Sequence, residues 1–492
     1  MFIKAIPESA GVPSKGILNY LEFLNKRELA IHSVLIARGD KLICEAYWAP
    51  FDAAVPHRMY SQTKSYVGLA VRLLADDGLI SLDDKIIKYF PDKLPEKIHP
   101  FLAELSIRNM LMMRTCFDGC PTWFTSDTDD RVKYYFSHTP AVYPGTQYHY
   151  DSEGSFVMGA LVERLTGKTF LDYLRDKCLR EIGFSETAYC LKCPGGYSWA
   201  DSALICTPLD MLKYGRFVGC YGKWDGRQII RRGIFEEAFS EKSATFESGF
   251  RAYADNGYTS QFWHSYGKAF GFNGMHDQFT MYDPETDITF TCTSGNRRNT
   301  SSREIMTEFL LNNVIEQAAD GALPENEADY RELEDYISGL ELIASTGAKN
   351  SAVEAEINGR IFTAEKSTTG ISDFSFTFSE NKCEFSYVNE QGSKKIVAGR
   401  GEVNIFQDFP QTGYSGEIGG KVCPGHTYKC AASFAWESEN QMLMKVQIID
   451  EYIGNLYISF AYRDGYARVR MDGDAEHFLK EYNTAFTAKL KD

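Results

Sequence analysis

The residues of this sequence best suited to chemistry are a serine and a lysine three positions apart. Ser61 and Lys64 spell S-x-x-K, and such a pair at a helix start shares one face, about one turn apart. The apolar residues that follow have helical spacing: Val67, Ala70, Val71 and Leu74, with Gly78 as a stop. Because a serine hydroxyl attacks only when a nearby base takes its proton, the pair predicts a nucleophile beside its base. The alternative is a serine cap followed by a solvated lysine.

Two other S-x-x-K matches lack this setting. Ser265 and Lys268 lie among glycines and aromatic residues that have no helical period. Ser379 and Lys382 lie between two stretches of alternating apolar residues, which predict a hairpin. Only the Ser61 match therefore predicts a serine at a helix start, where the helix N-terminus favours developing negative charge.

Size and composition indicate a globular protein of two or three domains. The chain has 492 residues, a hydrophobic fraction of 44%, 33 Phe and 29 Tyr, which is enough for large packed cores. Its net charge of −15 argues against nucleic acid and anionic membranes as partners. The start has no basic-then-apolar signal segment, and no apolar run reaches about 18 residues, so we expect a cytoplasmic protein.

The sequence predicts neither a metal nor a cofactor. Its histidines are scattered without an H-E-x-x-H pattern, and no glycine-rich phosphate loop or G-x-S-x-G elbow occurs. The 12 cysteines are expected to be reduced and mostly buried. Cys190 and Cys193 form a lone C-x-x-C, but no second pair with matching spacing completes a metal or redox site, so we interpret it as a coincidence.

Strand and helix patterns predict an α+β domain followed by an all-β domain. Residues 32–48 predict a hairpin, and residues 277–295 predict a second strand pair that turns at 283–285. A helical middle lies between them, and an amphipathic helix follows at 303–318. We therefore expect one sheet, built from both ends of the first domain, with helices around it.

Composition shifts give the predicted domain boundaries. Residues 1–325 form the predicted α+β domain, and the acidic stretch 326–346 is expected to be a connector with some helix. Residues 347–492 contain short alternating strands and glycine-rich turns, which predict a barrel-like all-β domain. The sequence indicates no role for this second domain and no subunit number.

Five segments in the first ~320 residues occur in a recognisable order. They are PESAGVPSKGI, YSQTKSYVG with Ser61, LSIRNMLMMRT, YPGTQYHYDSEGSFVMGALVERLTG and GFNGMHDQFTMYDPETDITFTCTSGN. Together they resemble the serine β-lactamase-like family, which includes class C β-lactamases, DD-peptidases, D-aminopeptidases and carboxylesterases. The resemblance implies an antiparallel sheet flanked by helices, of the β-lactamase/DD-peptidase type, and serine hydrolase activity.

The resemblance also implies a role for each residue of the candidate site. Ser61 would be the nucleophile that forms an acyl-enzyme, and Lys64 and Tyr150 would act as general acid and base. The backbone N–H groups of Ser61 and Met275 would form the oxyanion hole. Ser152, in the last position of a Y-x-[NS] motif, would orient the substrate or Lys64.

The third motif departs from the family pattern. Relatives that bind a substrate carboxylate carry K-T-G or H-x-G there, whereas alignment on the 283–285 turn gives Phe272, Asn273 and Gly274. All three are predicted to bind substrate: Phe272 as pocket wall, Asn273 near the substrate carbonyl, and Gly274 by close backbone approach. Because the cation is missing, we expect neutral esters or amides to be preferred and penicillins to be turned over slowly or not at all. Lys268, just upstream, could supply a charge by another route.

Two hypotheses follow. The first is a serine hydrolase that cleaves a small ester, amide or peptide through Ser61. The second is a catalytically weak penicillin-binding or partner-binding protein that keeps the fold. The set of Ser61, Lys64 and Tyr150 favours the first, because a protein that only binds has no physical need for all three.

Overall fold

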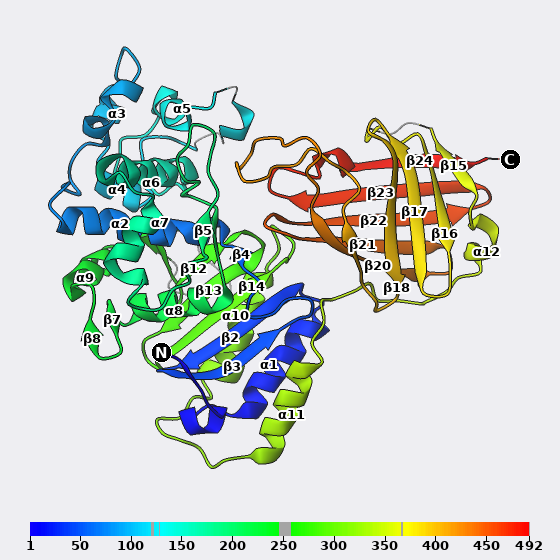
Figure 1. Cartoon of the computed structure of the whole chain (residues 1–492), viewed down its shortest axis with the longest axis horizontal. Coiled ribbons are helices and arrows are strands. Elements are labelled where there is room, and N and C mark those ends of the chain that lie inside the picture. Colours follow the sequence, from blue (N-terminus) through cyan, green and yellow to red (C-terminus); the bar gives the residue numbers. More distant parts are fainter. Residues whose placement is uncertain (120–122, 127, 246–256, 366–367, 492) are drawn as a thin grey trace. The chain divides into compact units, whose positions relative to one another are not determined.

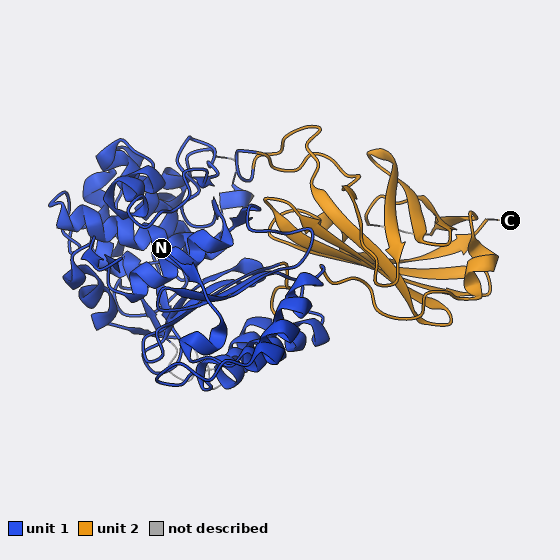
Figure 2. Ribbon diagram, turned by 60° about the horizontal axis from the view of Figure 1, so that its bottom comes forward, with its two compact units in different colours: residues 1–294, 300–341, 417–420 blue, residues 295–299, 342–416, 421–492 orange. Residues whose placement is uncertain are grey.

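The computed structural model of the chain divides into two compact units (Figure 1, Figure 2). It describes residues 1–492 except 120–122, 127, 246–256, 366–367 and 492. Unit 1 comprises residues 1–294, 300–341 and 417–420, and unit 2 comprises residues 295–299, 342–416 and 421–492. The main change of unit, between Glu341 and Leu342, falls inside the predicted connector, and two short segments belong to a different unit from their sequence neighbours.

A sheet built from both ends of its sequence forms the centre of unit 1. Strand β2 (Ile31–Arg38) pairs antiparallel with β3 (Lys41–Tyr47) on one side and with β14 (Ile288–Ser294) on the other. The strand order within the described residues is β1-β3-β2-β14-β13-β12-β11-β10-β9. Both predicted hairpins are therefore confirmed. The other strands are β1 (Ile3–Lys4), β9 (Ser243–Ala244), β10 (Gly257–Thr259), β11 (Phe262–His264), β12 (Phe270–Gly274) and β13 (Gln278–Asp283).

Helices cover both faces of this sheet, as the continuous apolar run in β2 requires. Side chains alternate along a strand, so Val34 and Ile36 belong to one core while Leu35 and Ala37 pack with Leu212 in another. The predicted α+β arrangement is confirmed. The first core includes α1 (Ser14–Lys26), α10 (Ser302–Leu310) and α11 (Glu327–Ser338), and Leu212 belongs to α8 (Pro208–Gly219).

The acidic connector contains a helix, as predicted, but most of the segment belongs to unit 1. Its helix α11 places Leu333, only 1% exposed, in the core with α1. Asn25 of α1 donates a hydrogen bond to the Tyr336 hydroxyl at 2.8 Å. Tyr336 and Ile337 pack on the same core. The acidic composition obscured this narrow apolar stripe, which is all that a helix needs to dock on a core.

The candidate site lies at the starts of two helices of unit 1 that pack together, α2 (Thr63–Asp76) and α6 (Ser152–Thr166). The turn η2 (Tyr60–Gln62) leads directly into α2, and Gly78, at φ 73°, follows its end as predicted. None of the described helices has the length and hydropathy needed to cross a bilayer. The other elements are α3 (Pro100–Ala103), α4 (Ile107–Leu111), α5 (Arg131–Ser137), α7 (Phe170–Leu174), α9 (Arg232–Ser240), β4 (His57–Arg58), β5 (Tyr189–Cys190), β6 (Leu204–Cys206), β7 (Lys223–Trp224) and β8 (Arg227–Gln228).

Unit 2 is a β-barrel, which confirms the predicted all-β domain. Strand β18 also pairs in parallel with β20, so nine of its described strands close into a ring, and β19 pairs with β20 beside it. Aromatic side chains fill the barrel; the Phe376 ring lies 5.0 Å from Phe385 and 4.8 Å from Phe460. The elements are α12 (Val353–Ile357), β15 (Ile361–Ala364), β16 (Asp373–Phe378), β17 (Lys382–Asn389), β18 (Gly392–Arg400), β19 (Ile405–Asp408), β20 (Lys429–Ser438), β21 (Gln441–Ile449), β22 (Ile453–Arg463), β23 (Tyr466–Ala475) and β24 (Thr484–Leu490).

Candidate active site

Ser61 lies in the η2 turn, beside a strained backbone. Tyr60, the residue before it, has a φ of 46°, a left-handed conformation that is rare for a bulky side chain. Arg58 holds the Tyr60 ring in place, because its guanidinium carbon lies 4.3 Å from the ring centroid and its Nε donates to the Ser202 carbonyl at 3.0 Å. Backbone strain that the surrounding packing maintains is a common feature of functional sites.

Lys64 contacts the serine directly. Its Nζ donates to Ser61 Oγ at 2.9 Å and to the backbone carbonyl of Asp201 at 2.7 Å. Lys64 is only 1% exposed, and both of these acceptors are neutral. The structure thus brings the predicted nucleophile and its predicted base together. Sequence reasoning missed Asp201, because a carbonyl acceptor belongs to every residue type and leaves no signal in the sequence.

Tyr150 also lies close to Lys64. The Lys64 Nζ is 5.1 Å from the centroid of the Tyr150 ring, and this tyrosine is 39% exposed. The ring stacks on Trp263 of β11, with centroids 5.8 Å apart, and Trp263 meets Tyr258 edge-on at 4.9 Å. Ser61, Lys64 and Tyr150 therefore occupy one site with an aromatic wall, which the scattered aromatic residues of the sequence did not predict.

The start of α6 explains why Tyr150 lies there. Asp151 caps this helix: its Oδ1 accepts from the Gly154 N–H at 2.8 Å, and its Oδ2 accepts from the Thr115 hydroxyl at 3.0 Å. Burial raises the pKa of Asp151, although these hydrogen bonds oppose the rise. Ser152 is the first residue of α6 and is half-buried. Its role in orienting substrate or Lys64 stays a prediction.

The end of β12 lies against the nucleophile turn at Gly274. A Cβ on Gly274 would be 2.2 Å from the carbonyl oxygen of Met59, so only glycine fits there. Met275 then begins a short turn in which His276 and Asp277 both have a φ of 58°. Met275 directly follows Gly274, and Gly274 contacts Met59 in the segment that leads to Ser61. The oxyanion role of its N–H stays a prediction.

Comparison with known proteins places this geometry in a family. The family model described as Beta-lactamase matches residues 24–312. The chain belongs to the beta-lactamase family. The match includes Ser61, Lys64, Tyr150 and the whole of β12, and it excludes the barrel of unit 2.

Relatives within the beta-lactamase family indicate a hydrolase. The 6-aminohexanoate-dimer hydrolase of Paenarthrobacter ureafaciens is 26% identical over 307 residues, which cover 58% of this chain and 78% of that protein. A solved Bacillus anthracis structure, named provisionally as a 6-aminohexanoate-dimer hydrolase, is 19% identical, has a TM-score of 0.52 and covers 66% of this chain and 88% of its own. A penicillin-binding protein homologue from Caulobacter crescentus is 14% identical, has a TM-score of 0.50 and covers 60% and 95%, respectively.

The third motif of this beta-lactamase family member differs in part from its prediction. Phe272 is 1% exposed, and its ring packs 5.6 Å from Tyr214 and 5.4 Å from Phe262. The structure therefore gives Phe272 a place in the core and not in a pocket wall, because alternate residues of β12 face opposite sides. Asn273 faces the other side and is 8% exposed, and its Oδ1 has no hydrogen-bond partner in the described part of the chain.

Within the described residues, the cysteine and acidic side chains form no candidate metal site. Cys190 and Cys193 are free thiols, and burial raises the pKa of both, that of Cys193 to about 12. A thiol of this kind is a poor nucleophile and metal ligand at neutral pH. Across the described ranges, no group of three or more His, Cys, Asp and Glu side chains could hold a metal ion.

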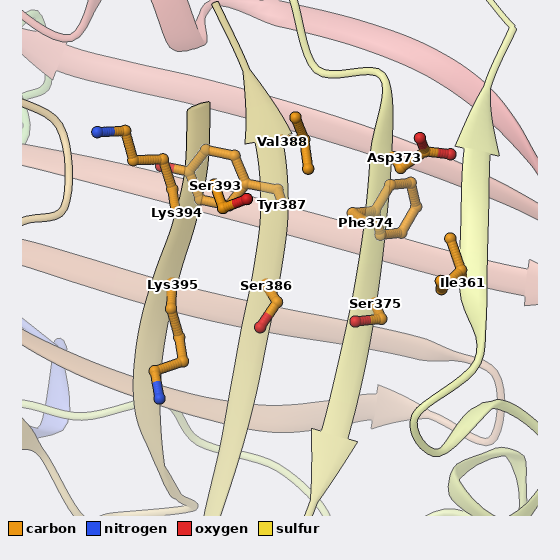
Figure 3. Close-up of a pocket in the computed structure, with 10 residues that line it drawn as sticks. All are labelled: Ile361, Asp373, Phe374, Ser375, Ser386, Tyr387, Val388, Ser393, Lys394 and Lys395. Carbon is orange, nitrogen blue, oxygen red and sulfur yellow. The ribbon is translucent and has the colours of Figure 1, made fainter. Parts of the chain in front are cut away.

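Unit 2 has a pocket of its own on strands β15 to β18 (Figure 3). Its volume is about 330 Å³. Ser375 and Ser386 are register partners and lie between Ile361 of β15 and Lys395 of β18, in one row across the strands. None of the predicted site residues lines this pocket, so the candidate chemistry belongs to unit 1.

Proposed function

We propose that the protein is a serine hydrolase that cleaves a small ester or amide through an acyl-enzyme on Ser61. The 2.9 Å contact between Lys64 Nζ and Ser61 Oγ carries this proposal. It supplies a base at hydrogen-bond distance from a nucleophile, which acyl transfer requires. The name of the 26% identical relative, 6-aminohexanoate-dimer hydrolase, adds a short linear amide to the substrates worth testing.

The proposed reaction has two halves. Lys64 in its amine form, with Tyr150, takes the proton of Ser61 Oγ as this oxygen forms a bond to the substrate carbonyl carbon. The oxyanion that forms accepts hydrogen bonds from the N–H groups of Ser61 and Met275. The proton then passes to the leaving oxygen or nitrogen, the C–O or C–N bond breaks, and the acyl group stays on Ser61. In the second half, a water molecule gives a proton to the same groups as its oxygen bonds to the acyl carbon. The bond between this carbon and Ser61 Oγ then breaks, the proton returns to Ser61 Oγ, and the acid leaves.

The remaining residues of the proposal bind substrate. Asn273 is the candidate contact for the substrate carbonyl region, because its buried amide oxygen has no partner within the described residues. Gly274 lets backbone approach closely, and Ser152 lies at the start of the helix that follows Tyr150. Phe272 is left out, since it packs in the core.

The test is covalent labelling. A fluorophosphonate should add one adduct, mapped by mass spectrometry to Ser61, and Ser61→Ala should abolish both the adduct and turnover of a small p-nitrophenyl ester. Ser265→Ala is the matched control, because Ser265 also belongs to an S-x-x-K sequence and should not matter. An adduct elsewhere would overturn the assignment. Labelling of Ser61 without turnover of any ester or amide would favour the penicillin-binding or partner-binding alternative.

A further inference from the structure

A buried ion cluster lies behind the candidate site in unit 1. Arg131, at the start of α5, forms two hydrogen bonds with Glu153: Nε to Oε2 at 2.6 Å and Nη2 to Oε1 at 3.0 Å. Its third nitrogen, Nη1, makes an ion pair with Asp201 Oδ1 at 2.9 Å. The three side chains are between 2% and 6% exposed. One guanidinium therefore joins two carboxylates away from water.

Arg131 also packs against two aromatic rings. Its guanidinium carbon lies 4.1 Å from the ring centroid of Phe156 and 5.3 Å from that of Trp123. Nη1 also donates to Cys193 Sγ at 3.2 Å. Burial raises the pKa of Glu153, and the nearby Arg131 charge opposes that rise. A planar fork held in this way fixes the distance between the groups that it binds.

The two carboxylates belong to the segments that hold Lys64 and Tyr150. Asp201 presents its own backbone carbonyl to Lys64 Nζ at 2.7 Å. Glu153 is in the first turn of α6, three residues after Tyr150. Arg131 is thus a short bridge between the carbonyl that holds one proposed acid/base residue and the helix start that holds the other.

We propose that Arg131, acting through Asp201 and Glu153, is a positioning residue that fixes Lys64 and Tyr150 relative to Ser61. The inference rests on the proposed function, since it assigns a geometric role within that reaction. Buried ion pairs contribute little net stability compared with apolar replacements. Small displacements of catalytic groups, in contrast, reduce reaction rates strongly. The cluster should therefore affect the rate of acylation more than substrate binding.

The main variant is Asp201→Asn, which keeps the shape and the backbone carbonyl but removes the charge that Arg131 binds. We expect kcat for a small p-nitrophenyl ester to fall roughly 10- to 100-fold, while KM changes less than about twofold. Labelling of Ser61 by a fluorophosphonate should slow by a similar factor.

Arg131→Lys keeps a positive charge but loses the planar fork that binds both carboxylates, so it should not react at the wild-type rate. The double variant Asp201→Asn/Arg131→Met should be no slower than the slower of its two single variants, because the two residues act as one unit.

The control is Arg400→Met in unit 2. Arg400 makes a comparable buried pair with Glu354 at 2.7 Å, with the two side chains 7% and 16% exposed. Its loss should lower the unfolding temperature without changing kcat.

Variants at Arg131 and Asp201 that fold and retain the wild-type kcat would overturn the positioning role, as would a loss that lies entirely in KM. Should Arg131→Met fail to fold, Asp201→Asn alone decides between these results. The two proposals fail in different ways. If the wild-type protein is not labelled at Ser61, both fall. If it is labelled and the cluster variants react as fast as wild type, only the positioning role falls.

Discussion

The amine of Lys64 lies 2.9 Å from the hydroxyl of Ser61, although the two residues belong to different local structures. Ser61 is in a short turn with a strained residue before it, and Lys64 is in the first turn of α2. The carbonyl that holds the amine in place comes from Asp201, 137 positions further along the chain. The geometry of the candidate base therefore depends on a loop that is remote in sequence.

Removing either proposed acid/base group should slow the reaction strongly. We expect Lys64→Ala and Tyr150→Phe each to lower kcat/KM for a small ester by ~100-fold or more, the usual effect of losing acid–base help. Tyr148→Phe is the control, because Tyr148 lies in the same aromatic cluster, 5.7 Å from Tyr258, and its hydroxyl has no hydrogen-bond partner within the described residues. Steady-state kinetics give the answer, and near-normal rates in both variants would mean that another group activates Ser61.

The neutral third motif should set a preference for uncharged substrates. A charge-assisted hydrogen bond contributes roughly 1.5–3 kcal/mol, or one to two factors of ten in kcat/KM. Asn273 and Gly274 supply no such charge, so a neutral ester should have a higher kcat/KM than a matched ester that carries a carboxylate. The measurement is kcat/KM for the pair at several ionic strengths. A preference for the anion that weakens with salt and disappears in Lys268→Ala would show that Lys268 supplies the charge.

A buried histidine pair should make stability depend on pH. His32 Nδ1 and His57 Nε2 lie 3.1 Å apart, and burial lowers the pKa of His57 from 6.5 to about 4 and that of His32 well below 6.5. Between about pH 4 and pH 6.5, the unfolded chain binds more protons than the folded chain. The free energy of unfolding should therefore reach its full value above pH 6.5 and fall as the pH drops towards 4. His57 should account for up to about 3 kcal/mol of this fall.

Urea unfolding at pH 7.5, 6 and 5 measures this effect. His57→Gln should flatten the pH dependence, whereas a change at half-buried His138 should leave it as in the wild type. An equal slope in the wild type and in His57→Gln would assign the pH dependence to other groups.

Residues 417–420 should stabilise unit 1 although they come from the sequence of the barrel. Gly419 donates its N–H to the Lys192 carbonyl at 2.7 Å, and a Cβ on it would lie 1.8 Å from Cε3 of Trp199. Gly419→Ala should therefore lower the free energy of unfolding by about 1–3 kcal/mol, because an overpacked side chain forces its neighbours to move. At Gly321 a Cβ would meet nothing within 4 Å, so Gly321→Ala is the control. If Gly419→Ala and the wild type were equally stable in chemical denaturation, that result would contradict the expected clash.

Local patterns in the sequence determined much of this protein. The helical spacing after Ser61 predicted α2 and its end at Gly78, and turn residues predicted the β2–β3 and β13–β14 hairpins. Alternation and glycine-rich turns predicted the barrel. These features are local, since periodicity and turn chemistry act between residues a few positions apart. The order of individually weak motifs along the chain also predicted the family, and the match over residues 24–312 confirms it.

Only the tertiary structure decided how the distant parts meet. Lys64, Arg131, Glu153 and Asp201 come from four separate segments, and no pattern along the chain links them. The core position of Phe272 and the docking of α11 through Leu333 likewise depend on which face of each element finds a partner. The physical reason is that burial and hydrogen bonding are satisfied in space, so a carbonyl at Asp201 or a glycine at 419 acquires its role only from the groups that folding brings against it.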